Sequence, residues 1–396
     1  MTNTLPQIAF HEVANRQWDC VVIGAGPAGS LAASRTAQAG LETLLVERKQ
    51  FPRDKVCGAC LNHRALSILE SIGLGDLPSL VGGVPIDSFE VRFGQRSLRL
   101  ALPAGIAISR AALDQELAVV AVQRGASFLP QTAATVVFDS ENCETRTVQL
   151  TCNQSPIKEI AIKTRMVIAA DGLGHPSLRS LNEFGEIVSP SSRIGVGTTI
   201  SNSADFIQPG VIHMAVGRHG YVGMVQVENG KLNVAAAIDS KAAKDSESLQ
   251  TLINQTLTEA GRPPFEEECH WSGTLPLTRG TRRVASNRVF LIGDAAAYVE
   301  PFTGEGMTWA FAGGLTVGDL AAQAVDAPAS TACFWQTHWD QQVAGRQKWC
   351  QRLALLLRSP SSIRVAMQIA KALPVVANRI IREMNQDYKY LKANIT

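Results

Sequence analysis

The chain has 396 residues, of which 45% are hydrophobic and 18% are charged, and its formal net charge at pH 7 is +2. This length is enough for one large or two modest domains, and the small net charge gives no reason to expect nucleic-acid binding. The sequence contains no apolar run of membrane-spanning length, no secretory pattern in Met1–Gln17 and no disulfide rhythm among its eight cysteines. We therefore expect a cytoplasmic protein.

The first fifty residues predict a βαβ unit. Trp18–Ile23 is an apolar run typical of a strand buried on both faces, Ser30–Ala39 has helical spacing, and Leu41–Glu47 is the next strand. The first turn reads Gly24-Ala-Gly26-Pro-Ala-Gly29, a pattern whose glycines allow a pyrophosphate to approach a helix N-terminus. Glu47 can accept hydrogen bonds from ribose hydroxyls and would repel a 2′-phosphate. The nucleotide is therefore expected to be FAD or NAD.

The rest of the chain predicts more α/β structure on both sides of an antiparallel segment. The Asn229-Gly230 pair is a strong hairpin signal within that segment. We expect strands in 86–102, 127–150, 166–170, 193–239 and 289–292, and helices in 64–72, 111–124, 246–260, 304–322 and onward to Tyr390 with breaks at Pro360 and Pro374. The predicted α/β nucleotide domain comprises 1–90, 103–185 and 280–330, the antiparallel-sheet domain comprises 91–102 and 186–279, and 331–396 is a helical C-terminal region.

Two later segments narrow the choice of nucleotide. One contains Asp171-Gly172, and the other contains Gly293-Asp294 followed by Pro301-Phe-Thr-Gly304-Glu-Gly306-Met307. With the glycine turn, these motifs resemble the flavoprotein monooxygenases of the aromatic-hydroxylase type and the related geranylgeranyl reductases, over Trp18–Leu320. The resemblance implies an FAD-dependent oxidoreductase, in which a Rossmann-like FAD-binding domain is interleaved with an antiparallel-sheet substrate domain. It also implies NAD(P)H as a transient reductant.

The resemblance implies roles for individual residues. Asp294 would bind the ribityl hydroxyls, Pro301 would pack against the ring, and Arg110 would reach the FAD. Asp171 would lie near the pyrophosphates. Each of these residues also has an alternative role: Asp171 could be a turn residue at a strand end, Asp294 could be a helix N-cap, and Arg110 could be a surface residue. The helix that starts at Gly304–Met307 would face the N1/C2 edge of the flavin. The predicted cofactor-binding residues are Gly24, Gly26, Pro27, Ala28, Gly29, Glu47, Arg48, Lys55, Cys57, Gly58, Ala59, Arg110, Asp171, Gly172, Asp294, Pro301, Gly304, Gly306 and Met307.

The loop Phe51–Asn62 is the most distinctive local segment. It resembles the loop that covers the FAD in geranylgeranyl reductases, and Arg53 and Lys55 could neutralise a pyrophosphate. Cys57-Gly-Ala-Cys60 is also a CxxC pair, which leaves a flavin-linked dithiol oxidoreductase as an alternative function. No second CxxC or paired histidine follows at metal-binding spacing, so we predict no metal site.

The motifs do not separate two reactions of this superfamily. One is NAD(P)H-dependent hydroxylation of a small molecule, which we prefer, and the other is saturation of double bonds in an isoprenoid or lipid. The antiparallel segment should form an apolar pocket over the flavin, which suggests a lipophilic, polyketide- or isoprenoid-like substrate. Cys57, Tyr221 and His213 are the candidate catalytic residues, although a histidine in such a position is more often structural than a catalytic base.

The C-terminal region is strongly basic. From Gln341 to Thr396 there are ten Lys and Arg but only two acidic residues, interleaved with apolar residues. One interpretation is a membrane-surface helix pair that gives peripheral membrane contact. The other is a helical cap on the FAD domain with a solvated basic face.

Overall fold

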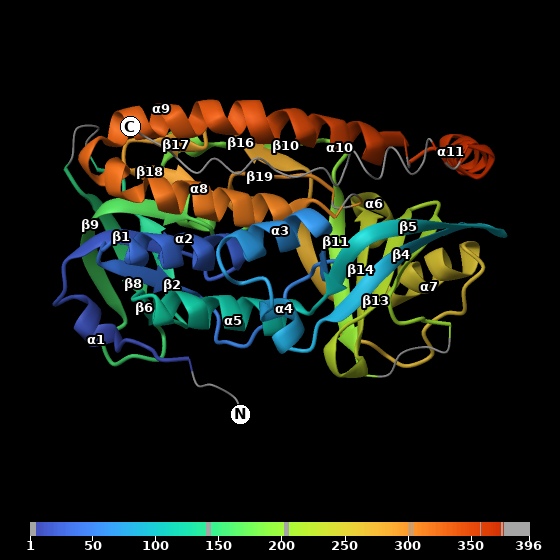
Figure 1. Cartoon of the computed structure of the whole chain (residues 1–396), viewed down its shortest axis with the longest axis horizontal. Coiled ribbons are helices and arrows are strands. Elements are labelled where there is room, and N and C mark those ends of the chain that lie inside the picture. Colours follow the sequence, from blue (N-terminus) through green and yellow to red (C-terminus); the bar gives the residue numbers. More distant parts are fainter. Residues whose placement is uncertain are drawn as a thin grey trace.

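The computed structural model describes residues 5–139, 144–201, 206–300, 302, 304–356, 358–373 and 375. Figure 1 shows two halves, with an α/β unit around α2 and β1 on the left and a second sheet with β4, β5 and β13 on the right. Helices α9 (Pro328–Trp339) and α10 (Gly345–Leu356) run along the top, and α11 (Pro360–Ala372) lies at the far right. None of the described helices is long and apolar enough to span a bilayer.

The left half is built on an eight-stranded sheet whose central strands are parallel in the order β18, β9, β1, β2 and β6. Apart from the partly exposed first half of β9, these strands are short, mostly apolar runs that are almost completely buried, as expected for a sheet covered by other elements. Its strands are β1 (Trp18–Ile23), β2 (Thr43–Val46), β6 (Ser127–Leu129), β7 (Ala133–Val136), β8 (Arg146–Thr151), β9 (Glu159–Ala169), β17 (Ala285–Ser286) and β18 (Val289–Leu291).

Helices from distant parts of the chain pack beside this sheet. Helix α2 lies between α8 and α5, and α3 packs on α8. Their apolar residues form the core together with the strands. The helices of this half are α1 (Phe10–Val13), α2 (Pro27–Gln38), α3 (His63–Ser71), α4 (Leu77–Leu80), α5 (Arg110–Gln123) and α8 (Gly306–Asp326).

The right half is an eight-stranded sheet in the order β15, β11, β14, β13, β12, β4, β5 and β3. All its pairs are antiparallel except β12 with β4. Its strands are β3 (Cys60–Leu61), β4 (Val84–Phe93), β5 (Arg96–Ala107), β11 (Arg193–Ile200), β12 (Val211–Gly217), β13 (Gly220–Gln226), β14 (Leu232–Asp239) and β15 (Ser272–Pro276). Helices α6 (Ser240–Asp245) and α7 (Leu249–Glu259) follow β14, and a small sheet joins β10 (Glu186–Val188), β16 (Arg279–Thr281) and β19 (Ala297–Tyr298).

The interleaved α/β architecture predicted from the sequence is confirmed, with differences at particular elements. The hairpin β4–β5 spans 84–107, so the part of the second sheet assigned to 91–102 is too short. Pro85, Pro103 and Gly105 obscure its ends, because these residue types are rare in strand interiors. The Asn229-Gly230 turn lies between β13 and β14 as predicted, with both residues at positive φ. Pro360 begins α11, whereas the break predicted at Pro374 lies outside the described residues.

The contact between α2 and α8 gives a stability test. A Cβ atom on Gly314 of α8 would lie 2.3 Å from the carbonyl oxygen of Ala28 in α2. Gly314→Ala should therefore force the two helices apart and lower the free energy of unfolding by about 1–3 kcal/mol. The free energy is measured by urea denaturation.

Gly345→Ala is the matched control, since Gly345 is also helical but has no atom within 4 Å of its Cβ position. That variant should be unchanged or gain up to about 1 kcal/mol. Equal stability of the Gly314→Ala protein and the wild type would contradict the packing argument.

Candidate active site

The turn between β1 and α2 has the conformation that its glycines predict. Gly24 has φ of 101°, and a Cβ on Gly29 would lie 1.9 Å from the carbonyl oxygen of Gly24. No larger residue fits at either position. The N-terminus of α2 therefore meets the end of β1 closely, and its free N–H groups point out of the turn.

Glu47 holds this turn in place. Its Oε2 accepts hydrogen bonds from the Ala25 amide at 3.1 Å and from Arg53 at 3.2 Å, and its Oε1 accepts one from the Lys49 amide at 2.9 Å. The side chain is buried, whereas the neighbouring Arg48 is exposed. Contact of Glu47 and Arg48 with the ribose stays a prediction, since neither residue lines the cavity described below.

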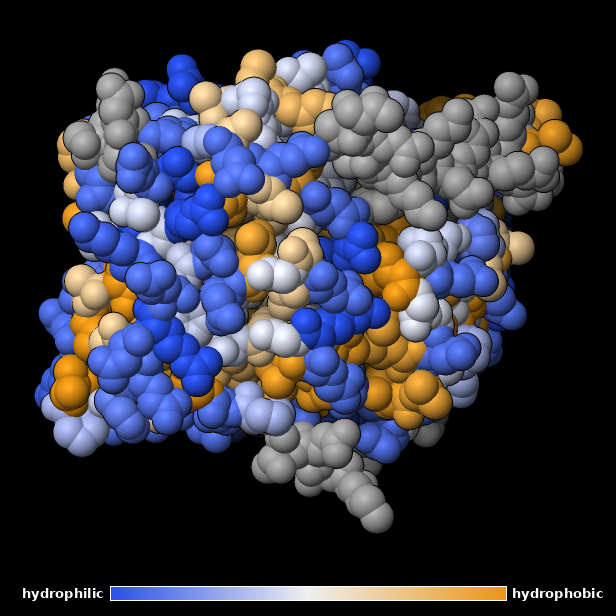
Figure 2. All heavy atoms as spheres, turned by 60° about the vertical axis from the view of Figure 1, so that its left-hand side comes forward, coloured by the Kyte–Doolittle hydropathy of each residue, from blue (hydrophilic) through white to orange (hydrophobic). Residues whose placement is uncertain are grey.

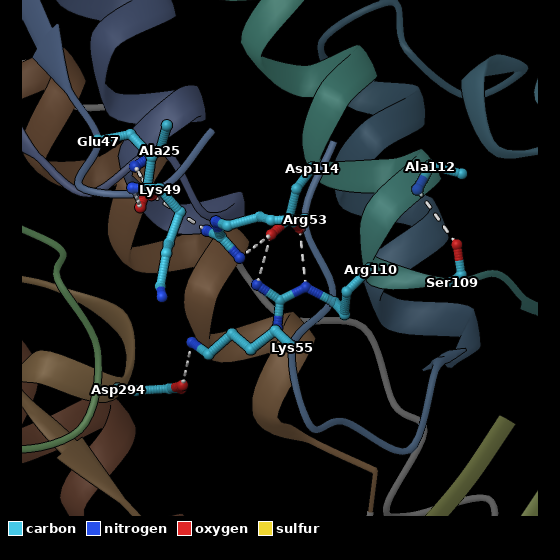
Figure 3. Close-up of polar contacts among 10 residues, drawn as sticks. All are labelled: Ala25, Glu47, Lys49, Arg53, Lys55, Ser109, Arg110, Ala112, Asp114 and Asp294. Carbon is cyan, nitrogen blue, oxygen red and sulfur yellow. Dashed lines mark hydrogen bonds and ion pairs between the residues drawn. The ribbon is translucent and has the colours of Figure 1, made fainter. Parts of the chain in front are cut away.

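A buried chain of charges runs from Glu47 to α5 (Figure 3). Arg53 contacts Asp114 at 3.1 Å, and Arg110 binds both oxygens of Asp114 at 2.7 and 2.8 Å. Burial by itself would lower the pKa of Arg110, but the Asp114 carboxylate raises this pKa above its ordinary value. The guanidinium therefore remains charged. Nη2 of Arg110 and Nη2 of Arg53 lie 3.5 and 3.8 Å from the Cβ position of Gly26. Two oriented cations thus flank the glycine turn.

Asp114 was not among the predicted site residues, although its spacing from Arg110 is informative. The two residues are four positions apart on one helix, and such residues lie on the same face. A buried arginine needs an acidic partner, so the Arg110–Asp114 spacing was the available signal.

A second ion pair links the loop after β2 to the end of β18. Lys55 Nζ lies 3.2 Å from Oδ2 of Asp294, which belongs to a short 3-10 helix over Gly293–Ala295. Figure 3 shows both side chains on the same side of the charge chain. The sequence predicted a cofactor role for each of these residues, and the fold places them together across 239 positions.

The start of α8 is held by residues that the sequence analysis missed. Asn62 donates to the Gly304 carbonyl at 3.3 Å, accepts from the Thr308 hydroxyl at 2.8 Å and caps α3. Glu305 forms a buried ion pair with Arg64 at 2.7 Å, although burial raises the pKa of this carboxyl. These contacts turn the Gly304–Met307 backbone toward the cavity. Pro301 lies outside the described residues.

One cavity of about 630 Å³ unites most of the predicted cofactor residues. It continues over the antiparallel sheet, where Tyr221 lines it, and ends at residues of α11. Gly24, Gly29, Glu47, Arg48 and Asp171 are outside its lining. The predicted residues that line it are Gly26, Pro27, Ala28, Lys55, Cys57, Gly58, Ala59, Arg110, Gly172, Asp294, Gly304, Gly306 and Met307.

Two predicted site residues, Asp171 and His213, make contacts within the protein and do not line the cavity. Oδ2 of Asp171 accepts a hydrogen bond from the Ser177 amide at 2.8 Å, and burial raises its pKa, which matches the alternative of a strand-end turn residue. His213 is buried but does not line the cavity, whereas its strand neighbours Ile212 and Met214 do. Its Nδ1 hydrogen-bonds Glu90 at 2.8 Å, and its Nε2 accepts from the Gln208 amide at 3.1 Å. The structure therefore favours the structural interpretation of His213.

Comparison with known proteins identifies the cofactor. Residues 17–330 match the family described as "FAD binding domain". The chain belongs to this family. It is an FAD-dependent oxidoreductase, as the resemblance of its motifs implied.

Individual relatives and structures cover nearly the whole flavoprotein. The menaquinone reductase of Mycobacterium tuberculosis (strain ATCC 25618 / H37Rv) is 28% identical, over 93% of this chain and 90% of the relative. The digeranylgeranylglycerophospholipid reductase 1 of Methanopyrus kandleri is 28% identical, over 86% of this chain and 91% of the relative. The crystal structure of the p-nitrophenol 4-monooxygenase PnpA from Pseudomonas putida DLL-E4 has a TM-score of 0.75, with 14% identity over 93% of this chain and 98% of that one. The last likeness shows a common fold.

The residues of the flavoprotein fit FAD. The helix N-terminus of α2 and the guanidinium groups of Arg53 and Arg110 match a pyrophosphate in charge. Asp294 supplies a carboxylate that can accept hydrogen bonds from hydroxyl groups. Gly58 and Gly304 have no atom within 4 Å of their Cβ positions, which leaves open space on two sides of the cavity for a ring. Tyr298, which the sequence analysis did not select, also lines this part of the cavity.

The two cysteines of the CxxC pair differ in environment. Both are free and both line the cavity, and the Asn233 amide donates to the Cys57 carbonyl at 2.9 Å. Burial raises the pKa of the Cys60 thiol to about 12. Dithiol exchange requires a thiolate, so this environment disfavours Cys60 as an attacking group. The dithiol function stays an untested alternative.

Arg110 provides a direct test of the cofactor site. A charge-assisted hydrogen bond contributes about 1.5–3 kcal/mol, so Arg110→Gln should weaken FAD binding by about 10- to 100-fold. The dissociation constant is measured by titrating the FAD-depleted protein with FAD and following flavin fluorescence.

Arg124→Gln is the control at the opposite end of the same helix. Arg124 donates to Ser34 Oγ at 2.9 Å and to the Ile72 carbonyl at 3.2 Å, and it does not line the cavity. This variant should bind FAD like the wild type. Equal dissociation constants for the two variants would show that Arg110 does not contribute to FAD binding.

Proposed function

We propose that the flavoprotein is an NAD(P)H-dependent reductase that saturates a carbon–carbon double bond in the isoprenoid chain of a lipophilic substrate. The observation that carries this proposal is the apolar continuation of the cofactor cavity over the antiparallel sheet. Beyond the cofactor residues the lining is dominated by aliphatic and aromatic side chains. Such a surface binds a hydrocarbon by removing it from water, at about 25 cal/mol for each Å² buried.

Part of the floor of this continuation is made of very small residues. Gly195 pairs with Ala237, and Gly223 pairs with Ala235, so these four residues are neighbours on β11, β13 and β14. All four line the cavity. Leu98, Leu100 and Leu102 of β5 line it as well. The small residues leave a slot in this part of the floor, which suits an isoprenoid chain by shape.

The curated relatives support reduction. The menaquinone reductase and the digeranylgeranylglycerophospholipid reductase are both named for reducing a lipophilic molecule, and both align over nearly their full length. Hydroxylation, which we preferred from the sequence, remains the second candidate because p-nitrophenol 4-monooxygenase has the same fold. That likeness concerns the fold, whereas the two reductases are each 28% identical to this chain.

FAD, once reduced by NAD(P)H, would supply a hydride for the double bond, and a proton must come from another source. Tyr221 is suited to hold this proton. Its side chain is buried and lines the cavity, and its enclosed hydroxyl lies near Glu300. Burial and the negative charge of Glu300 raise the pKa of Tyr221 well above its usual value. The phenol therefore stays protonated at neutral pH, and in the proposed reaction it delivers this proton to the bound substrate.

The identity of the product tests the proposed reaction. With NADPH or NADH and menaquinone in detergent, the enzyme should form a product that has gained two hydrogen atoms under anaerobic conditions. The gain must persist after the quinone ring is reoxidised, because only then is the side chain saturated. Mass spectrometry measures it. An oxygen requirement with the gain of an oxygen atom would establish hydroxylation and overturn the proposal.

Tyr221→Phe separates proton donation from cofactor binding. Loss of a general acid lowers turnover by about 100-fold or more, whereas FAD content should stay at the wild-type level. Turnover is measured per bound FAD in the same assay. His213→Gln replaces a buried polar residue on a neighbouring strand, outside the cavity, and should keep wild-type turnover. Equal turnover of Tyr221→Phe and the wild type would show that the proton comes from another group.

A further inference from the structure

Helix α11 forms the outer end of the cavity. Ile363 and Met367 are buried and line the cavity, and they pack with Leu98 and Val91 of the β4–β5 hairpin. Ala366 and Ile369 also line the cavity, but both are exposed to solvent, Ile369 to 48%. Residues that are exposed and line a cavity mark its opening. The cavity therefore opens beside α11.

The outer side of α11 is apolar as well. Val365, Ile369 and Leu373 are four positions apart, so they form one stripe along a helix with 3.6 residues per turn. They are 53%, 48% and 54% exposed. Because Ile369 belongs both to this stripe and to the opening, the apolar surface continues from the outside of the helix into the cavity. On the face in Figure 2, hydrophilic and hydrophobic residues are interspersed.

Positive charge is concentrated in the segment that contains this stripe. Between residues 345 and 372 the chain has six Lys and Arg and no Asp or Glu. Arg364 and Lys371 are seven positions apart on the flank of α11, and Lys348 and Arg352 lie on α10. All four are exposed. The Arg364 guanidinium lies 5.7 Å from the ring of Phe93 in β4, so this flank of α11 is also attached to the hairpin.

We propose that α11 seats the enzyme on an anionic bilayer, with its apolar stripe in the headgroup region and the cavity opening to the lipid. An apolar helix face flanked by Lys and Arg binds such a surface by burial and by attraction to lipid phosphates. A symmetric contact with a second copy would bring the same cations against each other, which is unfavourable. The proposal rests on the lipophilic substrate proposed above, which could enter from the bilayer without crossing water.

Figure 1 supports this arrangement. Helix α11 lies at the end of the molecule, above the β4–β5 hairpin and on the opposite side from α1. Contact with a flat surface through this end leaves the α/β half and its helices in water. The apolar stripe is therefore placed where a bilayer can reach it.

Vesicle co-sedimentation of the FAD-loaded full chain tests the proposal. The wild type should bind vesicles of phosphatidylcholine with phosphatidylglycerol, bind weakly to phosphatidylcholine alone, and be released by salt. Val365→Glu with Leu373→Glu changes the stripe outside the cavity lining and should lower binding at least about tenfold. Arg352→Gln with Lys371→Gln should lower it by about fivefold for each charge removed.

Leu80→Glu is the matched control, because Leu80 is 83% exposed but belongs to α4 and does not line the cavity. This variant should bind vesicles like the wild type. Wild-type protein that does not sediment with anionic vesicles would overturn the proposal. So would equal binding of the Val365→Glu/Leu373→Glu protein, or a dimer in light scattering that this double variant dissociates.

The vesicle assay contains no substrate, so its result is independent of the proposed reaction. Failure to reduce menaquinone in detergent would count against the proposed function and leave the bilayer contact standing. Turnover in detergent without vesicle binding would support the proposed function and count against the bilayer contact. If both proposals hold, the Val365→Glu/Leu373→Glu protein should lose turnover of vesicle-embedded menaquinone while its turnover of detergent-dispersed menaquinone persists.

Discussion

The buried pairing of Asp114 with Arg110 and Arg53 is the interaction on which the cofactor site depends. Two guanidinium groups in a buried position are costly unless a carboxylate compensates them, and removal of one partner of a buried pair costs about 3–5 kcal/mol. Asp114 compensates both, and Glu47 extends the chain to the glycine turn. The loop after β2, helix α5 and the first βα turn are therefore held in one arrangement. The cations at Gly26 follow from it.

The two halves of the molecule contribute different parts of the cavity. The α/β half supplies the glycine turn, the Lys55–Asp294 pair and the start of α8, and the antiparallel sheet supplies an apolar slot. Polar groups are concentrated where a charged cofactor is expected, and the slot contains little besides Tyr221 that can orient a polar group. A reaction at a hydrocarbon chain needs this division, because binding comes from burial and chemistry comes from the cofactor end.

Much of the fold could be predicted because its signals are local. The strand β1, the turn at Gly24 and the helix α2 follow one another in the chain, and so do β13, the Asn229-Gly230 turn and β14. The ends of β4 and β5 could not be predicted, since Pro103 and Gly105 break the alternating pattern. Asn62 and Glu305 were missed for a different reason. Their partners Gly304 and Arg64 are more than 200 positions away, and no local pattern reports such a contact.

The sequence by itself determined the cofactor class and the interleaved α/β architecture, because glycine turns and strand-end carboxylates are short motifs whose geometry is set by neighbouring residues. Only the tertiary structure decided that His213 is outside the cavity and Tyr221 is in its wall, since the face of a strand that a residue occupies depends on pairing with distant strands. It also decided that α11, one short segment of a basic tail, forms the cavity opening. The packing of α11 against β4 and β5 joins residues that are more than 200 positions apart, and that contact exists only in the folded chain.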